Sequence, residues 1–426
     1  MNPGRGLILA APSSGSGKTT ITLGLLRALK RANVAVRGAK SGPDYIDPAF
    51  HAAACGTGSL NLDAWGMRQD RLDELAAGDG LLLIEGAMGL FDGAPPAGRG
   101  ATADLAKRLR LPVVLIVDAA RMSQSIAPLV TGFVRHDAST RIAAVLLNRV
   151  GSDRHERILR DALGPLGLPV LGAVRRSPAL SLPSRHLGLV QASEHNDLEQ
   201  FLTHAADAVA AQVDLEALRR LAAPLPAPPR SPPPRAVFPR KVAVARDAAF
   251  TFLYAHQERG WRQSGTRIAF FSPLANEPVP EADMVFLPGG YPELHAKQLA
   301  AADQFFDSLR SAAATSLIYG ECGGYMVLGE TLTDSDGVEH RMAGLLGLRS
   351  SFATRKLHLG YRTLTSRSTL LTGRYAGHEF HYATTLSAEG HPLFEAEDAE
   401  GNALPAMGLQ DGRVMGSFAH IIDALS

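Results

Sequence analysis

Cysteine is scarce in this sequence, and long apolar runs are absent. Cys55 and Cys322 are the only cysteines among 426 residues and lie far apart in the chain, so we expect no disulfide framework and a reducing compartment. No apolar run approaches the roughly 18 residues of a membrane span. The N-terminus enters a strand-like stretch without the charged and apolar segments of an export signal. We therefore expect a cytoplasmic protein that does not enter membranes.

An excess of charge of either sign is also lacking. Lys and Arg total 43 against 42 Asp and Glu, which leaves no global field that could hold nucleic acid or an anionic surface. Any anion must then be bound locally. Hydrophobic residues make up 46% of the chain and charged residues 20%, a composition that excludes wholesale disorder and predicts well-formed cores.

The chain is too long for one hydrophobic core, and a proline-rich stretch divides it. At roughly 150 residues per domain, the length predicts two or three domains. Eight prolines stand among the sixteen residues from Pro224 to Pro239, where they prevent a helix interior or a central strand and favour extended backbone. We therefore expect a first domain over residues 1–223, a linker over 224–239 and a second domain over 240–426.

Both predicted domains carry the pattern of an α/β fold. Apolar strand-like runs alternate with amphipathic helical patterns, which is typical of a mostly parallel sheet flanked by helices on both faces. Residues 334–385 are richer in Gly, Thr, Ser and Arg, and we expect hairpins and loops there. The strands are expected at 6–11, 34–39, 81–87, 112–118, 141–148 and 169–174 in the first domain and at 241–246, 267–271, 284–287 and 316–319 in the second.

A glycine-rich turn follows the first predicted strand. The stretch A-P-S-S-G-S-G-K-T-T, residues 11–20, leads into an apolar helical pattern, although Pro12 stands where a P-loop has its first glycine. In such a unit, backbone N–H groups converge on phosphate oxygens at the helix N-terminus, a lysine adds positive charge and a hydroxyl ligates Mg²⁺. We predict a nucleoside triphosphate site formed by Gly15, Ser16, Gly17, Lys18, Thr19 and Thr20.

Four acidic residues in two predicted loops are candidates for completing this site. Asp44 and Asp47 lie in K-S-G-P-D-Y-I-D-P, whose prolines and glycine predict a loop and exclude a helix. Glu85 and Asp92 lie in E-G-A-M-G-L-F-D-G, at the carboxyl end of a predicted strand, where parallel sheets bind ligands. Because Mg²⁺ takes oxygen ligands, we predict that the metal binds to Thr19, Asp47 and Glu85 and that the substrate binds to Asp44, Tyr45 and Asp92.

The second domain contains a cysteine in the pattern of a nucleophile elbow. Cys322 directly follows a buried-strand pattern in S-L-I-Y-G-E-C-G-G-Y, with Gly320 two residues before it and Gly324 two after. Small residues flank a nucleophile on such a turn because the backbone packs closely there, and the next N–H points at the developing oxyanion. We predict Gly323 as one oxyanion donor and Gly290, in the P-G-G turn, as the second.

A cysteine nucleophile requires a base, because an unperturbed thiol is mostly protonated at neutral pH. His420, in G-S-F-A-H-I-I, follows a short strand pattern among small and apolar residues that suit a pocket. No acidic residue follows it within two positions, so we predict a Cys-His dyad that performs acyl transfer through a thioester. Four other histidines compete for the same role: His340, His358, His378 and His381.

With these motifs, nearly the whole chain closely resembles the cobyrinic and hydrogenobyrinic acid a,c-diamide synthases. The resemblance rests on G-P-D-Y-I-D-P, E-G-A-M-G-L-F-D-G, L-N-R-V-G-S-D-R-H, D-A-A-F-T-F, P-G-G-Y-P-E, G-E-C-G-G-Y and G-H-E-F-H-Y. It implies a P-loop NTPase-like first domain similar to dethiobiotin synthetase and a class I glutamine amidotransferase second domain of the cobalamin-pathway subtype. It also implies that Cys322 is the nucleophile and His420 its activating histidine, with Ile422 where most class I amidotransferases keep a Glu.

The reaction that the resemblance implies uses ATP, L-glutamine and a corrin-type macrocycle. ATP on the glycine-rich loop phosphorylates a peripheral carboxylate, and ammonia released from glutamine at Cys322 displaces the phosphate. Two rounds amidate the a and c acetate side chains. The sequence leaves open whether the macrocycle contains cobalt, which acetate reacts first, and the oligomeric state, a homodimer included.

Two other readings have discriminating features. A partition-type P-loop ATPase switch also combines a P-loop with doubly wound α/β structure, but such a switch does not explain the cysteine elbow, and the extra lysine that many of them carry near the loop is absent between Met1 and Gly17. Another tetrapyrrole amidotransferase, such as cobyric acid synthase, shares the second domain. The motif G-P-D-Y-I-D-P favours the a,c-diamide subgroup.

Overall fold

The structure is a computed structural model that describes residues 4–180, 197–227 and 239–425. The chain divides into two compact units, residues 1–233 and 234–426. Most of the expected linker lies outside the described residues. Its first residue, Pro224, belongs to the first unit, because the short strand β8 (Ala223–Pro224) pairs with Arg5 and Gly6.

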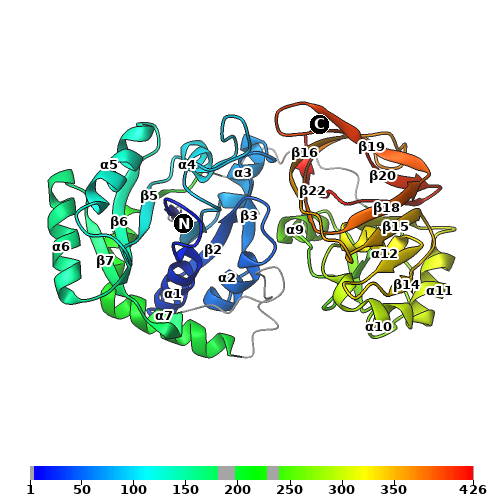
Figure 1. Ribbon diagram of the computed structural model, residues 1–426, viewed down its shortest axis with the longest axis horizontal. Coiled ribbons are helices and arrows are strands. Elements are labelled where there is room, and N and C mark those ends of the chain that lie inside the picture. Colours follow the sequence, from blue (N-terminus) through cyan, green and yellow to red (C-terminus); the bar gives the residue numbers. More distant parts are fainter. Residues whose placement is uncertain (1–3, 181–196, 228–238, 426) are drawn as a thin grey trace. The chain divides into compact units, whose positions relative to one another are not determined.

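The first unit is built on a sheet of parallel strands flanked by helices (Figure 1). Leu7, Ile8 and Leu9 on a central strand are all 0% exposed, so both faces of the sheet are covered, as their continuous apolar run predicts. Among the strands that the structure describes in this sheet, only β8 runs antiparallel. The parallel strands in spatial order are β3 (Leu60–Leu62), β2 (Val36–Ser41), β4 (Leu81–Glu85), β1 (Arg5–Ala10), β5 (Val113–Asp118), β6 (Ile142–Val150) and β7 (Val170–Arg175).

Helices connect these strands and supply the other half of each core layer. Leu23 and Leu26 of the first helix pack with Phe201 and Leu202 of the seventh in one apolar cluster that also includes Leu7 of the sheet. The helices are α1 (Lys18–Arg31), α2 (Asp47–Cys55), α3 (Gln69–Ala76), α4 (Thr102–Leu109), α5 (Ile126–His136), α6 (Asp153–Leu163), α7 (Leu198–Gln212) and α8 (Leu215–Leu221). Short 3₁₀ turns lie at Gly164–Leu166 and Pro178–Leu180.

The second unit has a larger sheet whose two halves differ. Five strands are parallel: β10 (Arg267–Phe271), β9 (Lys241–Ala245), β11 (Met284–Leu287), β12 (Leu317–Glu321) and β21 (Val414–Ser417). Five more continue it in antiparallel order: β20 (Ala403–Asp411), β19 (His391–Glu397), β16 (His358–Ser366), β17 (Arg374–His381) and β22 (His420–Ala424). The two-domain α/β prediction is confirmed, but parallel pairing covers only half of this sheet.

The remaining elements of the second unit pack around this sheet. A second sheet contains β14 (Glu339–Arg341), β13 (Thr331–Thr333), β15 (Gly347–Ser351) and β18 (Thr384–Glu389), so the stretch expected to form hairpins and loops contributes strands to both sheets. The helices are α9 (Ala255–Gln263), α10 (Ala296–Ala300), α11 (Asp303–Ala312) and α12 (Gly323–Leu328), with a 3₁₀ turn at Pro292–Leu294.

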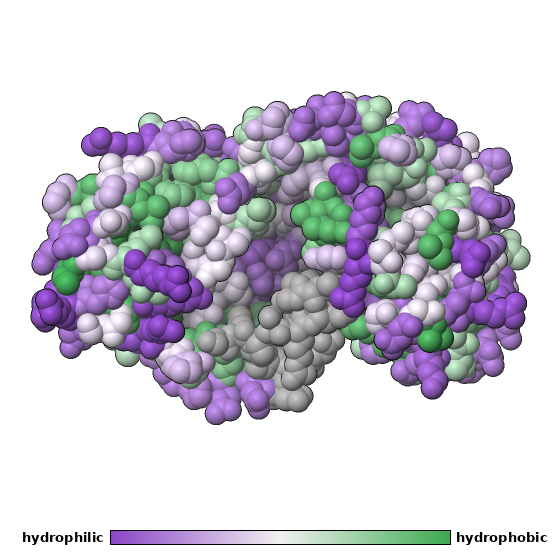
Figure 2. All heavy atoms as spheres, in the orientation of Figure 1, coloured by the Kyte–Doolittle hydropathy of each residue, from purple (hydrophilic) through white to green (hydrophobic). Residues whose placement is uncertain are grey.

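Hydrophilic and hydrophobic residues are interspersed on one face of the described surface (Figure 2). On the face that Figure 2 shows, green hydrophobic areas are small and separated by hydrophilic residues. Among the described residues, no helix is both long and apolar enough to cross a membrane.

Candidate active site

The glycine-rich turn lies between β1 and α1, where the sequence predicts it. Gly15 and Gly17 have φ angles of 78° and 83°, in the left-handed region that favours glycine, and Gly17 is the residue before the first helical turn. A side chain at Gly17 would lie 2.3 Å from Nδ2 of Asn148, which itself donates a hydrogen bond to the Ser16 carbonyl at 2.9 Å. The loop is therefore held in a shape that only glycine permits.

A cavity of about 1220 Å³ opens above this turn. The turn and the first residues of α1 form one wall, from Ser14 to Thr20, while Lys40 and Glu85 form another. Several arginines also line it: Arg121, Arg149, Arg175 and Arg176. Two of these guanidinium groups are paired with carboxylates, Arg149 with Asp118 and Arg175 with Asp153 and Glu156. A helix N-terminus, Lys18 and the remaining arginines still give this cavity the positive groups that an anion site needs.

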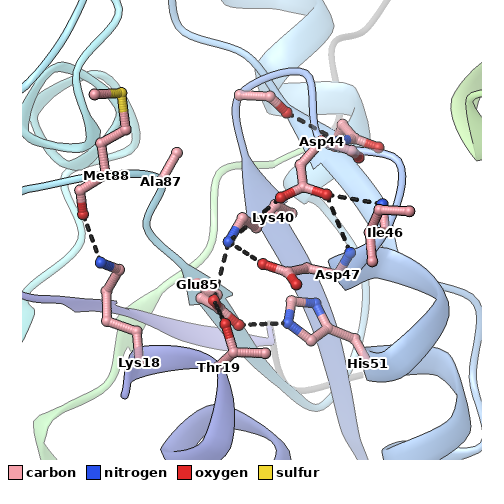
Figure 3. A network of polar contacts seen from close by, with 12 residues as sticks. Lys18, Thr19, Lys40, Asp44, Ile46, Asp47, His51, Glu85, Ala87 and Met88 are labelled. Atoms are coloured by element: carbon pink, nitrogen blue, oxygen red, sulfur yellow. Dashed lines mark hydrogen bonds and ion pairs between the residues drawn. The ribbon is translucent and has the colours of Figure 1, made fainter. Parts of the chain in front are cut away.

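Lys18 lies at the base of this cavity and is 7% exposed. Its Nζ donates a hydrogen bond to the Met88 carbonyl at 2.5 Å (Figure 3). It donates another to the Ser13 carbonyl at 3.3 Å. Burial lowers the pKa of this ammonium below its ordinary value. A lysine held in this way by backbone carbonyls points its charge toward the phosphate loop.

Next to it, Lys40 is the centre of a buried cluster of charges (Figure 3). Its Nζ contacts the carboxylate of Asp47, lies 2.9 Å from Glu85 Oε1 and lies 3.8 Å from Asp44 Oδ2. Burial disfavours the ammonium, but these carboxylates outweigh it and raise the pKa of Lys40. Lys40 therefore stays charged and neutralises the acidic residues around it.

Glu85 is fully buried and joins this cluster to the phosphate loop. Its Oε1 accepts a hydrogen bond from the Thr19 hydroxyl at 2.6 Å, and its Oε2 lies 2.8 Å from Nε2 of His51, which is also 0% exposed. Burial alone would raise the pKa of Glu85, but Lys40 and His51 hold it below its ordinary value. The Thr19 hydroxyl and an ionised Glu85 at one cavity wall are the hard oxygen donors that fit Mg²⁺.

The other acidic residues are divided between this cluster and nearby turns. Asp47 contacts Lys40 and does not line the cavity; burial and the neighbouring Asp44 raise its pKa. Asp44 Oδ1 accepts the backbone N–H groups of Ile46 and Asp47, at 2.8 and 3.1 Å. Asp92 Oδ2 accepts the Gly89 N–H at 2.9 Å. Tyr45 lies in the same loop as Asp44.

The prediction that prolines keep Asp47 out of a helix is wrong. Helix α2 begins at Asp47, and Pro48 lies in its first turn. A proline is tolerated there because the N–H groups of the first turn have no partner within the helix. The helix in turn carries His51 into the buried cluster.

In the second unit, Cys322 lies on a sharp turn between β12 and α12. Its φ of 49° and ψ of −104° are rare for a residue with a side chain and mark a strained backbone. A Cβ on Gly320 would lie 2.8 Å from the Gly324 backbone, and one on Gly324 would lie 1.9 Å from the Leu287 carbonyl oxygen. The flanking glycines are therefore required by close packing, as expected for a nucleophile elbow.

Two backbone amides lie beside this cysteine. The Gly323 N–H hydrogen-bonds the Cys322 sulfur, and a Cβ on Gly323 would lie 3.1 Å from the nitrogen of Gly290. A neighbouring loop holds the turn that contains Gly290, because the Gly289 carbonyl accepts hydrogen bonds from the N–H groups of Thr251 and Phe252 in that loop. Both amides predicted as oxyanion donors thus lie close to Cys322.

His420 is the first residue of β22 and is 2% exposed. A Cβ on Gly289 would lie 3.2 Å from His420 Nε2 and 3.3 Å from Cys322 Cβ, so the imidazole and the Cys322 side chain border the same point. Burial raises the pKa of the Cys322 thiol, so this thiol is protonated at neutral pH. The imidazole therefore lies close to the Cys322 side chain.

The competing histidines have other contacts. His358 and His381 stack on each other with ring centroids 4.7 Å apart, and His381 Nε2 lies 2.9 Å from Glu379. His340 Nε2 lies 2.8 Å from Asp334 on a hairpin. Burial lowers the pKa of His378 to about 3, so that imidazole stays neutral.

Several residues in these sites escaped the sequence analysis. Three of them, Lys40, His51 and Asn148, lie in the first unit. Lys40 and Asn148 belong to motifs quoted above but were given no role, and His51 lies just beyond such a motif. Glu321, the residue before the nucleophile, lies 3.5 Å from His420 through its Oε2. The residues that directly follow His420 include no carboxylate that could orient its imidazole. The fold brings Glu321 to it from another strand, which no local sequence pattern indicates.

Comparison with known proteins identifies both units. Residues 7–190 match the family described as the CobQ/CobB/MinD/ParA nucleotide binding domain, and residues 241–424 match the CobB/CobQ-like glutamine amidotransferase domain. The chain is 54% identical to hydrogenobyrinate a,c-diamide synthase of Brucella anthropi, with 98% of each chain covered. The enzyme of Rhizobium meliloti is 53% identical, over 98% of this chain and 99% of that one.

These matches confirm the resemblance seen in the sequence motifs and decide between its alternatives. A partition-type switch has no amidotransferase domain to match residues 241–424. The hydrogenobyrinate a,c-diamide synthase of Rhodobacter capsulatus is 51% identical, with 98% of each chain covered. The chain belongs to the hydrogenobyrinate a,c-diamide synthase family.

Proposed function

We propose that this chain converts the a and c acetate side chains of hydrogenobyrinate to amides, with ATP and L-glutamine, in the cytoplasm during cobalamin biosynthesis. The observation that carries the proposal is that one chain joins an ATP-type phosphate loop to a cysteine elbow with a histidine base, and that each half belongs to the corresponding domain family. Neither half alone accounts for a glutamine-dependent ligase.

The first unit activates the carboxylate. An acetate oxygen of the macrocycle attacks the γ-phosphorus of ATP, which forms an acyl phosphate and releases ADP. Lys18, the loop N–H groups and the α1 N-terminus stabilise the negative charge on the transferring phosphoryl group. Thr19 and Glu85, with Asp47 close by, would hold Mg²⁺, which supplies charge neutralisation on the phosphate oxygens.

The second unit makes the nitrogen nucleophile. The Cys322 thiol gives its proton to His420, and the thiolate attacks the glutamine side-chain carbonyl, whose oxygen is stabilised by the Gly323 and Gly290 N–H groups. The tetrahedral intermediate collapses to a thioester as the imidazolium returns the proton to the departing ammonia. Water then hydrolyses the thioester to glutamate and the free thiol.

Ammonia completes the reaction in the first unit. It attacks the acyl phosphate carbonyl, inorganic phosphate leaves, and the amide remains. Asp44, Tyr45 and Asp92 lie in the loops that follow β2 and β4, at the carboxyl edge of the sheet, and we assign them to the macrocycle.

The test is a reconstituted assay. The purified protein is incubated with ATP, Mg²⁺ and glutamine together with either the metal-free or the cobalt-containing macrocycle, and monoamide and diamide are separated by chromatography and weighed by mass spectrometry. The proposal predicts that the metal-free macrocycle is converted to a diamide and that one ADP is released for each amide formed. Formation of ADP and glutamate without any amide would refute it.

A further inference from the structure

The turn that carries the nucleophile also carries a buried carboxylate. Glu321 is the last residue of β12, directly before Cys322, and it is 1% exposed. Its Oε1 accepts the backbone N–H of Ile421 at 3.0 Å, and its Oε2 lies 3.5 Å from His420 Nδ1. One carboxylate therefore contacts both the imidazole and the strand that begins with it.

The two nitrogens of this imidazole face different groups. The Cε1 and Nε2 edge points toward Gly289, because a Cβ there would lie 2.4 Å from Cε1 and 3.2 Å from Nε2, and Cys322 Cβ borders the same point. Nδ1 is on the side of Glu321. The imidazole therefore has a carboxylate on its Nδ1 side and Cys322 on its Nε2 side. This arrangement lets the carboxylate orient the ring while Nε2 acts as the base for the thiol.

We infer that Glu321 is a positioning residue for His420. On the proposed function, on which this inference rests, Glu321 accepts a hydrogen bond from the Nδ1–H group of His420, so that the unprotonated Nε2 can take the proton of the Cys322 thiol. When the thiol proton arrives on Nε2, the carboxylate faces an imidazolium and stabilises it. The separation of 3.5 Å shortens to a hydrogen bond in the glutamine complex, as such contacts commonly do.

The fold explains why this carboxylate replaces one on the strand of the histidine. Ile422, two residues after His420, is 1% exposed, and its carbonyl accepts a hydrogen bond from His256 Nε2 at 2.8 Å. An acidic side chain there would be buried and would need a partner of its own. Glu321 instead reaches His420 from the parallel half of the sheet, and the Ile421 N–H holds it in place.

The test compares glutamine with ammonium as nitrogen sources for Glu321→Gln. We expect the glutamine-dependent kcat to fall about 10²-fold or more with KM for glutamine unchanged, because the amide no longer selects the Nδ1–H tautomer. Ammonium-dependent amidation should stay within about twofold of the wild type, since it bypasses His420. Glu258→Gln, which removes a carboxylate paired with surface arginines in the same unit, is the matched control and should change neither.

The outcomes separate this inference from the function on which it rests. Full glutamine-dependent kcat in Glu321→Gln would overturn the positioning role, whereas wild-type protein that forms no amide with either nitrogen source would overturn the proposed function. In a His420→Ala background, Glu321→Gln should cause no further loss, because it acts through the missing imidazole; an additive loss would contradict the inference. If Glu321→Gln does not fold, Glu321→Asp should lower kcat about tenfold at constant KM, and full activity of that variant would overturn the role.

Discussion

At the scale of single residues, the first unit depends on buried charges that neutralise one another. Lys40 and Glu85 are almost fully buried, and each would be costly without the other. Removing one partner leaves an uncompensated charge, while exchanging a carboxylate for an amide keeps the shape and changes only the charge. Amide variants therefore test roles in this cluster with the least disturbance of packing.

Glu85→Gln and Asp92→Asn should have different effects on amidation. Glu85 contacts Thr19 of the phosphate loop, so Glu85→Gln should lower both amidations together, by about 10²-fold, and raise the Mg²⁺ requirement. Asp92 lies on the loop after β4 and holds the Gly89 N–H, so Asp92→Asn should accumulate monoamide at normal metal dependence. A time course of monoamide and diamide across a Mg²⁺ titration distinguishes them. The assignments would be exchanged if Asp92→Asn alone shifted the metal requirement.

His378 should make the second unit sensitive to acid. Burial holds its folded pKa near 3, below the ordinary 6.5, so only the unfolded state takes up a proton between these values and stability falls as pH falls through this window. From pH 7 to pH 5 the loss is about 2 kcal/mol. Urea unfolding followed by Trp261 fluorescence in a Trp65→Phe background measures it. His378→Gln should remove most of this fall in the free energy of unfolding, and His391→Gln, at an exposed histidine, should remove none of it. The same pH dependence in the background protein and in both histidine variants would refute the role of His378.

At the scale of elements, the cysteine site depends on turns that bring separate strands together. Gly289, after β11, lies against both His420 of β22 and Cys322 after β12. The site therefore requires glycine at position 289, where the ends of three strands of one sheet come together.

Gly289→Ala should disable glutamine use and spare ammonium use. The added methyl would lie 2.4 Å from His420 Cε1, which must displace the imidazole, and we expect at least about a 10²-fold loss of glutaminase activity. Gly260→Ala is the matched control, because a Cβ there meets nothing within 4 Å and alanine favours helix α9. Glutamate release measured for both variants decides the matter. Normal release by Gly289→Ala would show that the imidazole is not placed as described.

Elements with a local sequence pattern could be predicted, and contacts between distant elements could not. The glycine-rich turn before Lys18 and the elbow at Cys322 are each set by a few consecutive residues, so the strand, turn and helix around them follow from the sequence. Lys40, His51 and Glu321 gained their roles from partners on other elements. Their positions in otherwise buried runs were the one available hint, because a buried charge requires a partner. Which partner it has depends on the order of strands in the sheet.

At the scale of the whole molecule, the proposed function divides the chemistry between two sites in one chain that share only ammonia. Loss of the first site should abolish amidation from any nitrogen source, while loss of the second should matter only when nitrogen comes from glutamine. The two units also belong to separate domain families, which agrees with this division of labour.

The most direct test of this division is amide formation by Cys322→Ser and Lys18→Ala, each measured with glutamine and with excess ammonium chloride. We expect Cys322→Ser to lose at least about 10³-fold with glutamine and to stay within about twofold of the wild type with ammonium. Lys18→Ala should lose about 10²-fold with both sources, because carboxylate activation precedes nitrogen attack. Equal loss by Cys322→Ser with the two sources, or unchanged amidation by Lys18→Ala, would contradict the two-site account.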